Sequence, residues 1–387
     1  MGRLRNLAWR VRYIFRFDAV LVVACVLAAL SCIAVPPDVQ YASYIDWRTL
    51  GLLFSLMVAT SGLARAQVLS RMCHALVGMC KSGGALVSAL VALAFFASMV
   101  VTNDVALVAF VPLAIAALRE AGLVGRLPFA IACMTVAANM GSMLTPIGNP
   151  QNIYLQSASG MAPCDLVCIM APYSVLAFLL LALAIGVAEL RGRKRCAPAS
   201  LQARGLAHAK PQSPLSMRDV APWAALIVVC LLCVARIVPV GVAVVAALVA
   251  ALGFDRRALR QVDYALLLTF VAFFVFVGNV ARIETVQHAI ASIVDGHVLL
   301  VGALASQLIS NVPAAIMLSG FTSDWPALLV GVNIGGLGTL VASMASLISY
   351  RQLAVAYPKA KGRYLLLFTG INLAFLVAML ALSLVIA

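Results

Sequence analysis

The feature that most constrains this chain is a series of apolar runs, each about as long as a lipid bilayer is thick. A spanning helix takes about 20 mostly apolar residues, and such runs recur from Ala19 to the C-terminus. They cover residues 19–35, 47–64, 82–118, 127–155, 166–190, 221–235, 238–254, 263–281, 297–321, 325–349 and 364–387. The sequence therefore predicts an all-α polytopic membrane protein.

Composition excludes the other broad classes. Of the 387 residues, 64% are hydrophobic and 10% are charged, whereas an ordinary soluble domain is about 45–50% apolar and about 25% charged. This balance excludes a soluble enzyme, a disordered tail and a secreted disulfide scaffold. The formal net charge of +14 does not indicate nucleic acid, because the basic residues lie between the apolar runs and form no stripe on a folded surface.

The basic residues instead set the orientation in the membrane, since loops rich in Lys and Arg stay in the cytoplasm. Placing segments 1–17, 65–81, 119–126, 190–218, 255–262 and 350–363 inside collects 24 of the 27 Lys and Arg residues. We therefore predict a protein of the inner (plasma) membrane with a cytoplasmic N-terminus and an external C-terminus. A cleaved signal peptide is disfavoured, because Pro36-Pro37 follows the first run where a small-residue cleavage site would stand.

Two of the runs are too short for two full crossings and are broken by polar residues. Run 82–118 breaks at residues 102–104, between loops that are both inside, and run 297–321 breaks at residues 310–311 and starts outside. Irregular backbone is tolerated in a bilayer only where it lines a cavity or is buried in protein. We predict about nine spanning helices plus two re-entrant hairpins that enter from opposite faces.

These features divide the chain into two halves joined by a linker that is basic and rich in Ala, Pro and Ser. The predicted parts are an N-terminal half, 1–189, with hairpin 82–118 and an interrupted helix over 127–155; a cytoplasmic linker, 190–219; and a C-terminal half, 220–387, with hairpin 297–321 and an interrupted helix over 325–349. Because the hairpins enter from opposite faces, the predicted repeat is inverted.

The two halves share polar motifs at the hairpin tips and at the interruptions. The first half has Ser98-x3-Thr102-Asn103 and Asn139-x-Gly141-Ser142, and the second has Ser306-x3-Ser310-Asn311 and Asn333-x-Gly335-Gly336. Paired discontinuous helices of this kind mark the site of a secondary transporter. Helix N-termini favour anions, and freed carbonyls with Ser, Thr and Asn oxygens can ligate a small cation. For any one residue, helix packing or a hydroxyl bonded back to its own helix is the alternative.

Asp104 is the one acidic residue of the 13 that this topology places at membrane depth. An intramembrane acid is costly and indicates a functional site. Ionised, Asp104 would complete a cation site with Asn103; protonated, it would carry the coupling proton. The alternative is a structural carboxyl that is hydrogen-bonded to helix ends. The four histidines fall in loops or at span ends and form no metal-binding pattern.

Four segments carry a resemblance to the ion transporter superfamily: SMVVTNDVALVAFVPLAI, AANMGSMLTPIGNPQN, LISNVPAAIMLS and GVNIGGLGTLVASMASLISY. This superfamily includes citrate-transporter-like permeases, divalent anion:sodium symporters, arsenite efflux permeases and NhaD-type sodium/proton antiporters. The resemblance implies two sodium sites. The first would use Ser98, Thr102, Asn103 and backbone near Gly141, and the second Ser306, Ser310, Asn311 and backbone near Gly335. It also implies that Thr145, Pro146 and Thr339 face the substrate cavity, and that the protein forms a homodimer.

The motif departs from that of the dicarboxylate carriers, where a threonine follows each tip asparagine. Asp104 and Val312 stand there instead, so two hydroxyls that would hold a carboxylate are missing. The Asn-Asp pair is more similar to the arsenite-efflux and pigmentation-permease branch. We count Asn139, Asn149 and Asn333 with Asp104 as candidates for substrate binding or proton coupling.

We therefore predict a secondary active transporter that moves a small anion, a carboxylate or an inorganic oxyanion, and is coupled to Na⁺ or H⁺ by alternating access. Membrane lipid is the other expected partner, and no cofactor besides the coupling ion is expected. The alternatives are an arsenite-type efflux permease, a Na⁺/H⁺ antiporter, a passive anion channel and an intramembrane enzyme. The enzyme is disfavoured, because neither Gly-x-Ser-x-Gly nor His-Glu-x-x-His occurs in the sequence.

Overall fold

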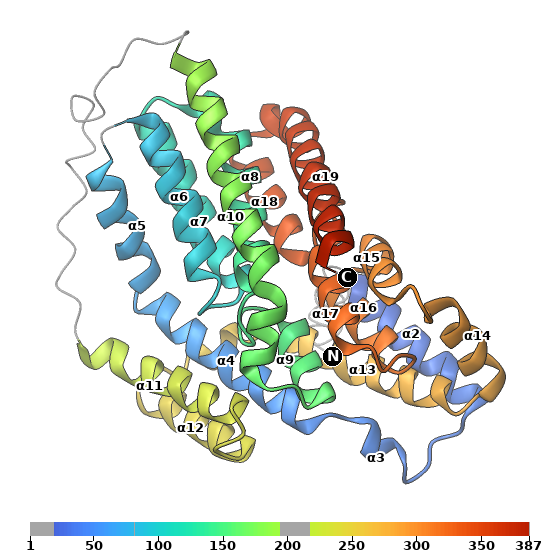
Figure 1. Ribbon diagram of the computed structural model, residues 1–387. Helices are drawn as coiled ribbons and strands as arrows, with labels where there is room; N and C mark the ends of the chain where they lie inside the picture. Colours follow the sequence, from blue (N-terminus) through green and yellow to red (C-terminus); the bar gives the residue numbers. More distant parts are fainter. Residues whose placement is uncertain (1–18, 81, 194–216, 387) are drawn as a thin grey trace, which may run out of the picture.

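The structure is a computed structural model that describes residues 19–80, 82–193 and 217–386 (Figure 1). The described residues form helices and loops, without a strand, which confirms the predicted all-α class. The N-terminal basic cluster, Lys81 and residues 194–216 of the predicted linker lie outside the described residues.

The helices of the first half run as follows: α2 Ala19–Ala34, α3 Tyr41–Tyr44, α4 Trp47–Arg65, α5 Val68–Met79, α6 Gly83–Ala97, α7 Asn103–Glu120, α8 Leu127–Ser142, α9 Pro150–Ser159 and α10 Pro163–Arg193. Those of the second half are α11 Met217–Val234, α12 Val240–Gly253, α13 Tyr264–Ala281, α14 Glu284–Val294, α15 Val298–Ile309, α16 Asn311–Ser319, α17 Trp325–Ile334, α18 Met344–Ala356 and α19 Lys361–Ile386. Helices α4 to α10 and α13 to α19 follow one order: a long helix, a shorter one, a helix pair, a second pair and a final long helix.

Among the described residues, six segments are long and apolar enough to cross a membrane, namely α4, 124–142, α10, α11, α13 and α19. A seventh is added if α14 and α15, bent by 106° to each other, count as one span. The chain is therefore a multi-pass membrane protein. Our count of nine stays a prediction, because it adds the 16-residue α2, the 14-residue α12 and the broken pair α17 and α18.

Segment 65–81, which we placed in a cytoplasmic loop, contains a helix. The three apolar residues Leu69, Cys73 and Val77 stand four apart on one face of α5 and are buried. This spacing is typical of a helix that covers a core with one stripe. Helix α14 takes the corresponding place in the second half.

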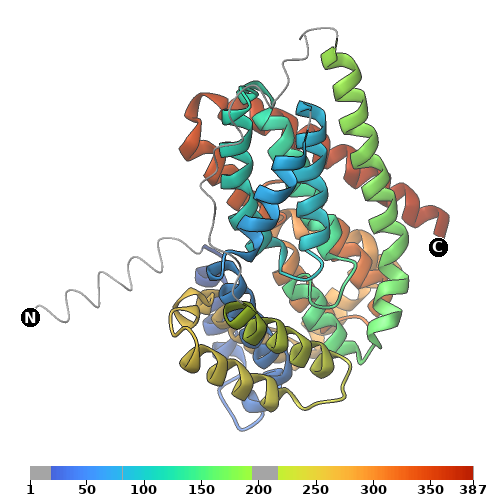
Figure 2. The same cartoon turned by 90° about the vertical axis from the view of Figure 1, so that its left-hand side faces the viewer.

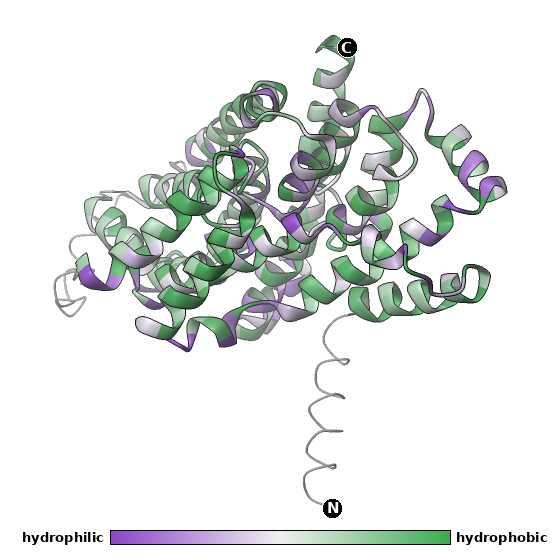
Figure 3. Cartoon of the chain, turned by 90° about the horizontal axis from the view of Figure 1, so that it is seen from below, coloured by the Kyte–Doolittle hydropathy of each residue, from purple (hydrophilic) through white to green (hydrophobic). Residues whose placement is uncertain are grey.

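Some helix pairs join the two halves and others lie within one half. Helix α4 packs against α11 and α12, and α13 packs against α2, whereas α6 packs against α8 and α15 against α17. Figure 2 shows α11 and α12 set apart from the long helix α10. Hydrophobic residues follow most of the helical ribbons (Figure 3). Large apolar side chains are exposed on the outer helices, among them Val175, Leu183, Val249 and Val377, as expected for surfaces that face lipid.

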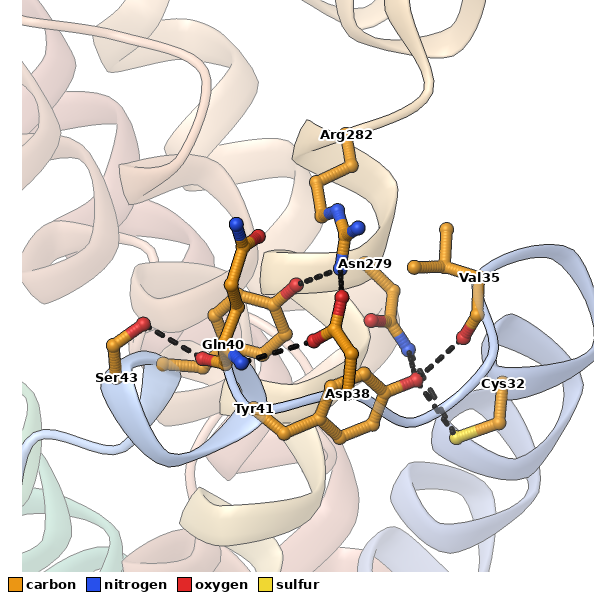
Figure 4. Close-up of polar contacts among 9 residues, drawn as sticks. Cys32, Val35, Asp38, Gln40, Tyr41, Ser43, Asn279 and Arg282 are labelled. Carbon is orange, nitrogen blue, oxygen red and sulfur yellow. Dashed lines mark hydrogen bonds and ion pairs between the residues drawn. The ribbon is translucent and has the colours of Figure 1, made fainter.

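A polar cluster fixes the end of α13 to the loop between α2 and α4 (Figure 4). The Tyr41 hydroxyl accepts a hydrogen bond from Asn279 Nδ2 at 2.8 Å and donates to the Val35 carbonyl. Arg282 forms an ion pair with Asp38 at 2.7 Å. At the other end of α13, Asp263 caps the helix by accepting from the Leu266 N–H, so both ends of α13 are held.

Candidate functional site

The two hairpin tips and the two helix breaks, far apart in the sequence, meet at one point. A small hollow is lined by Leu266 of α13 and by residues of both tips and both breaks: Asn103, Asp104, Pro150, Gln151, Asn311, Val312, Ser343 and Met344. Helix α7 packs against α8 and α18, and α16 packs against α9 and α17. Each hairpin therefore contacts the interrupted helices of both halves.

The first tip is held to the first break by its asparagine. The backbone N–H of Asn103 donates to the Gly148 carbonyl at 3.2 Å, and its Oδ1 accepts the N–H of Asp104 at 2.9 Å. Thr102, the residue before α7, has no side-chain bond to the helix. Ser98 is fully buried, and its hydroxyl donates to the Phe95 carbonyl. The polar residues 103 and 104 thus begin a helix and do not form a loop.

The second tip has the same hydrogen bonds at the corresponding positions. The N–H of Asn311 donates to the Ala342 carbonyl at 3.0 Å, and its Oδ1 accepts the N–H of Val312 at 3.0 Å. Ser306 is buried and bonds back to its helix at Gly302. Ser310 has φ 75° and ψ 154°, a region that costs a non-glycine residue about 1–3 kcal/mol. Packing around the second tip therefore holds a strained turn.

Glycine lets each interrupted helix approach the arm of its own hairpin. A Cβ atom on Gly141 would lie 2.1 Å from the Phe95 carbonyl oxygen and 2.7 Å from Ser98 Oγ. A Cβ on Gly335 would lie 2.8 Å from both Ala303 Cα and Ser306 Cβ. The structure thus brings Ser98 to Gly141 and Ser306 to Gly335, the pairs that we assigned to the two cation sites.

The asparagine of the first interrupted helix connects the first tip to the second half. Asn139 Oδ1 accepts from Asn103 Nδ2 at 3.0 Å and from the Ser343 hydroxyl at 3.1 Å. Its Nδ2 makes a long bond of 3.5 Å to the Gly336 carbonyl. Because Asn139 is buried, these bonds satisfy an amide that would otherwise be costly at this depth.

The matching asparagine, Asn333, reaches back into the first half. Its Oδ1 accepts from Asn149 Nδ2 at 3.0 Å and from Gln151 Nε2 at 3.3 Å, and its Nδ2 donates to Asn152 Oδ1 at 2.8 Å. Asn149 and Ser343 each directly precede the second helix of an interruption. Asn139 and Asn333 therefore make reciprocal contacts, which support the internal repeat; that the two halves are inverted in the membrane stays a prediction.

The two threonines assigned to the substrate cavity have partners of their own. The Thr145 hydroxyl donates to the Met99 carbonyl at 2.6 Å, and the Thr339 hydroxyl donates to the Gln307 carbonyl at 3.2 Å. These bonds fasten each break to its own hairpin. Pro146 is buried within the first break.

A larger cavity of about 420 Å³ lies beside the first tip and is lined by residues from α4, α7, α9, α13 and α18. Its polar lining residues are Thr60, Ser61, Thr102, Asp104, Gln261 and Asp263, and none of its described lining residues is Lys, Arg or His. One carboxylate oxygen of Asp104 is buried and has no hydrogen-bond partner within the part of the chain that the structure describes. The cavity is thus lined by two acids, and one of them, Asp104, has an oxygen without a partner that can take a cation or a proton.

Sequence reasoning missed four residues that the structure adds to the site: Gln151, Asn152, Gln307 and Ser343. Gln307 carries the most contacts. Its Nε2 donates to the carbonyls of Gly335 at 2.6 Å and Leu337 at 2.7 Å, and its Oε1 accepts the N–H of Thr339 at 2.9 Å. A polar residue directly after the motif serine was the available signal.

Comparison with known proteins places this geometry in a family. The sequence profile described as citrate transporter matches residues 8–323. The chain belongs to the citrate transporter family. An uncharacterised transporter of Methanocaldococcus jannaschii is 31% identical over 313 residues, 79% of this chain and 81% of that protein. The inner membrane protein YbiR of Escherichia coli is 32% identical over 319 residues, 81% of each chain.

A third relative matches a shorter stretch. The silicon efflux transporter LSI3 of Oryza sativa subspecies japonica is 36% identical over 118 residues, 30% of this chain and 24% of that protein. Membership of the citrate transporter family, together with the similarity to the Methanocaldococcus jannaschii transporter and to LSI3, establishes membrane transport as the general function of the chain. The resemblance to the ion transporter superfamily is thereby confirmed.

Proposed function

We propose that this chain is a secondary active transporter in which the first tip, with Asp104 and Asn103, binds the coupling cation, Na⁺ or H⁺. The unpartnered carboxylate oxygen of Asp104 carries this proposal. A buried anionic oxygen without a partner is costly, and binding a cation or a proton removes that cost. Asn103 lies beside it and connects through Asn139 to Ser343 in the second break, so occupancy of the first tip can affect the second break.

The cavity chemistry favours an uncharged, hydroxylated solute. We expected a small anion, yet two carboxylates and no basic side chain line the described wall of the cavity, and like charges repel strongly where water is scarce. The first N–H groups of α7 and α16 are bonded to their own tips, which removes donors that an anion would use. A weak inorganic acid in its neutral form fits the Ser, Thr and Gln side chains of the cavity, and one relative is named for silicon efflux.

The orientation is carried forward as part of the proposal: inner membrane, cytoplasmic N-terminus and external C-terminus. In that topology the 420 Å³ cavity extends from the cytoplasmic end of α13, at Gln261 and Asp263, to Asp104. Access from the cytoplasm to the first tip is what an exporter requires in its inward-facing state.

The test uses proteoliposomes that contain the purified protein. Accumulation of silicic acid, arsenite and citrate is measured under an imposed pH gradient or an imposed sodium gradient. We expect uphill accumulation of an uncharged acid, and its loss to the level of empty vesicles in Asp104→Asn. Asp165→Asn, which changes an exposed acid at the start of α10, serves as the matched control and retains wild-type rates.

Each alternative has its own outcome in this assay. Full coupled transport by Asp104→Asn would refute the role of Asp104. Citrate accumulation without uptake of the uncharged acids would restore the small anion as substrate. Equilibration without accumulation under either gradient would identify a passive channel.

A further inference from the structure

Gln307 occupies the break of the second interrupted helix from within the hairpin. Its two short hydrogen bonds, to the carbonyls of Gly335 and Leu337, come from one nitrogen, and a third carbonyl, that of Ala303, lies 3.4 Å from it. The other end of the carboxamide accepts the Thr339 N–H. The side chain is thus held at both ends by backbone of the break.

The first half has a different residue in the matching place. Met99 follows Ser98 as Gln307 follows Ser306, and each carbonyl accepts a threonine hydroxyl from its break. A thioether has no N–H to donate. An amide at this hairpin position therefore occurs only in the second half.

A second difference accompanies the amide. Gly338 stands three residues after Gly335, where the first half has Leu144 after Gly141. Gly338 has φ 105°, and a Cβ there would lie 2.3 Å from Gln307 Oε1. Only glycine leaves room for the carboxamide in this backbone conformation. Two positions therefore differ together, so that the second break is shaped to receive Gln307.

Carbonyl oxygens that converge at a helix break are the ligands that small cations take in membrane transporters. An amide NH₂ group has two N–H donors and partial positive charge, and it can take two such oxygens without bringing a net charge into the membrane. A cation cannot use the same two oxygens while the nitrogen lies 2.6 and 2.7 Å from them.

In the first break, the amide of Asn152 takes other carbonyls: its Nδ2 donates to those of Met143 at 2.9 Å and Thr145 at 3.0 Å. The Gly141 carbonyl, which matches that of Gly335, accepts the backbone N–H groups of Met143 and Leu144, and no side-chain donor to it occurs among the described residues. The two tips also differ in charge. The first tip carries Asp104, whereas Val312 stands at that place in the second, so the acid belongs to the half whose glycine carbonyl, that of Gly141, takes no side-chain amide among the described residues.

We propose that the Gln307 carboxamide takes the place of a cation in the second half, so that the chain binds one coupling cation, at the first tip. This inference rests on the proposed function for the identity of the first site, but the role of Gln307 can be tested separately. Replacing Gln307 with methionine, the residue of the first half, would open the second break to a cation.

The experiment measures thermal stability of the purified protein against NaCl, with choline chloride to hold ionic strength and pH constant. The variants are wild type, Asn103→Ala, Gln307→Met and the double variant, with Gln307→Ser as a second opening substitution. Gln156→Met is the control, because Gln156 is a buried amide that donates to two carbonyls, of Met161 and Val234, away from the tips. Bound ²²Na⁺ per chain is counted in parallel for wild type and for each variant.

We expect wild type to bind one sodium ion with a Hill coefficient of about 1, and Gln307→Met to bind a second with a coefficient above about 1. We expect the double variant to keep a sodium-dependent rise in thermal stability. Asn103→Ala alone and Gln156→Met should gain no sodium site. Two sodium ions on wild type, or no gain in either Gln307 variant, would overturn the inference. No response in wild type with a gain in Gln307→Met would uphold it and refute sodium as the coupling ion of the proposed function.

Discussion

At the scale of single residues, buried amides organise the centre of the protein. Asn139 and Asn333 each bind groups from both halves, and a buried amide that loses its partner leaves the other group unsatisfied. Such a loss costs about 1–3 kcal/mol for each group. The network therefore couples the positions of the two breaks, and removing one member exposes several others to this penalty.

Asn333→Ala is expected to destabilise the protein by about 3 kcal/mol or more, because Asn149, Gln151 and Asn152 lose their shared partner. Asn372→Ala is the control: Asn372 is equally buried but donates only to Phe368 of its own helix, so about 1 kcal/mol or less is expected. Unfolding midpoints in detergent compare the two. Equal losses would show that the contacts between the breaks contribute no stability.

At the scale of elements, close packing of α6 on α8 and of α15 on α17 sets the distance between each hairpin and its interrupted helix. Gly141 contacts backbone of the facing arm, so nothing flexible can move aside for a larger residue. The helix pair is therefore a close fit at a single position, as is usual where small residues let membrane helices approach.

Gly141→Ala is expected to push α6 away from α8, to destabilise the protein by about 1–3 kcal/mol as an overpacked core does, and to abolish cation binding at the first tip. Gly186→Ala, in the middle of α10 with open space around it, is expected to stabilise by about 0.5–1 kcal/mol. Thermal unfolding and sodium-dependent stabilisation of both variants check this. A Gly141→Ala protein with wild-type stability would contradict the close approach.

At the scale of the whole molecule, the interrupted helices place functional groups at the centre, while the long helices α10 and α19 present apolar surface outward. Two ion pairs, Arg65 with Asp255 and Arg126 with Glu189, lie at the ends of spans that we assign to the cytoplasm. The Arg65 guanidinium lowers the pKa of Asp255 in its exposed loop. Such pairs contribute little stability in water.

The topology predicts which cysteines are reached from outside the cell. Cys164, exposed at the start of α10, should react with a membrane-impermeant maleimide in intact cells when the other cysteines are replaced by alanine. A cysteine at Arg257, in the loop after α12, should react only after the membrane is opened. The reverse labelling pattern would show that the orientation in the membrane is opposite to the predicted one, and it would not bear on the fold.

The sequence by itself determined the membrane class, the positions of the two hairpin tips and the two helix breaks, and the acid at the first tip. These follow from local properties, since apolar run length and a polar interruption need no partner to be read. The pairing of Ser98 with Gly141 and of Ser306 with Gly335 was implied by the resemblance of these motifs to the ion transporter superfamily.

Only the tertiary structure decided that Asn139 and Asn333 reach into the opposite half, that Asp263 shares a cavity with Asp104, and that Gln307 fills the second break. These contacts join residues far apart in the chain. The sequence does not show whether a side-chain amide packs, caps a helix or takes the place of an ion. Its partners are set by the distances that packing imposes, which no local pattern contains.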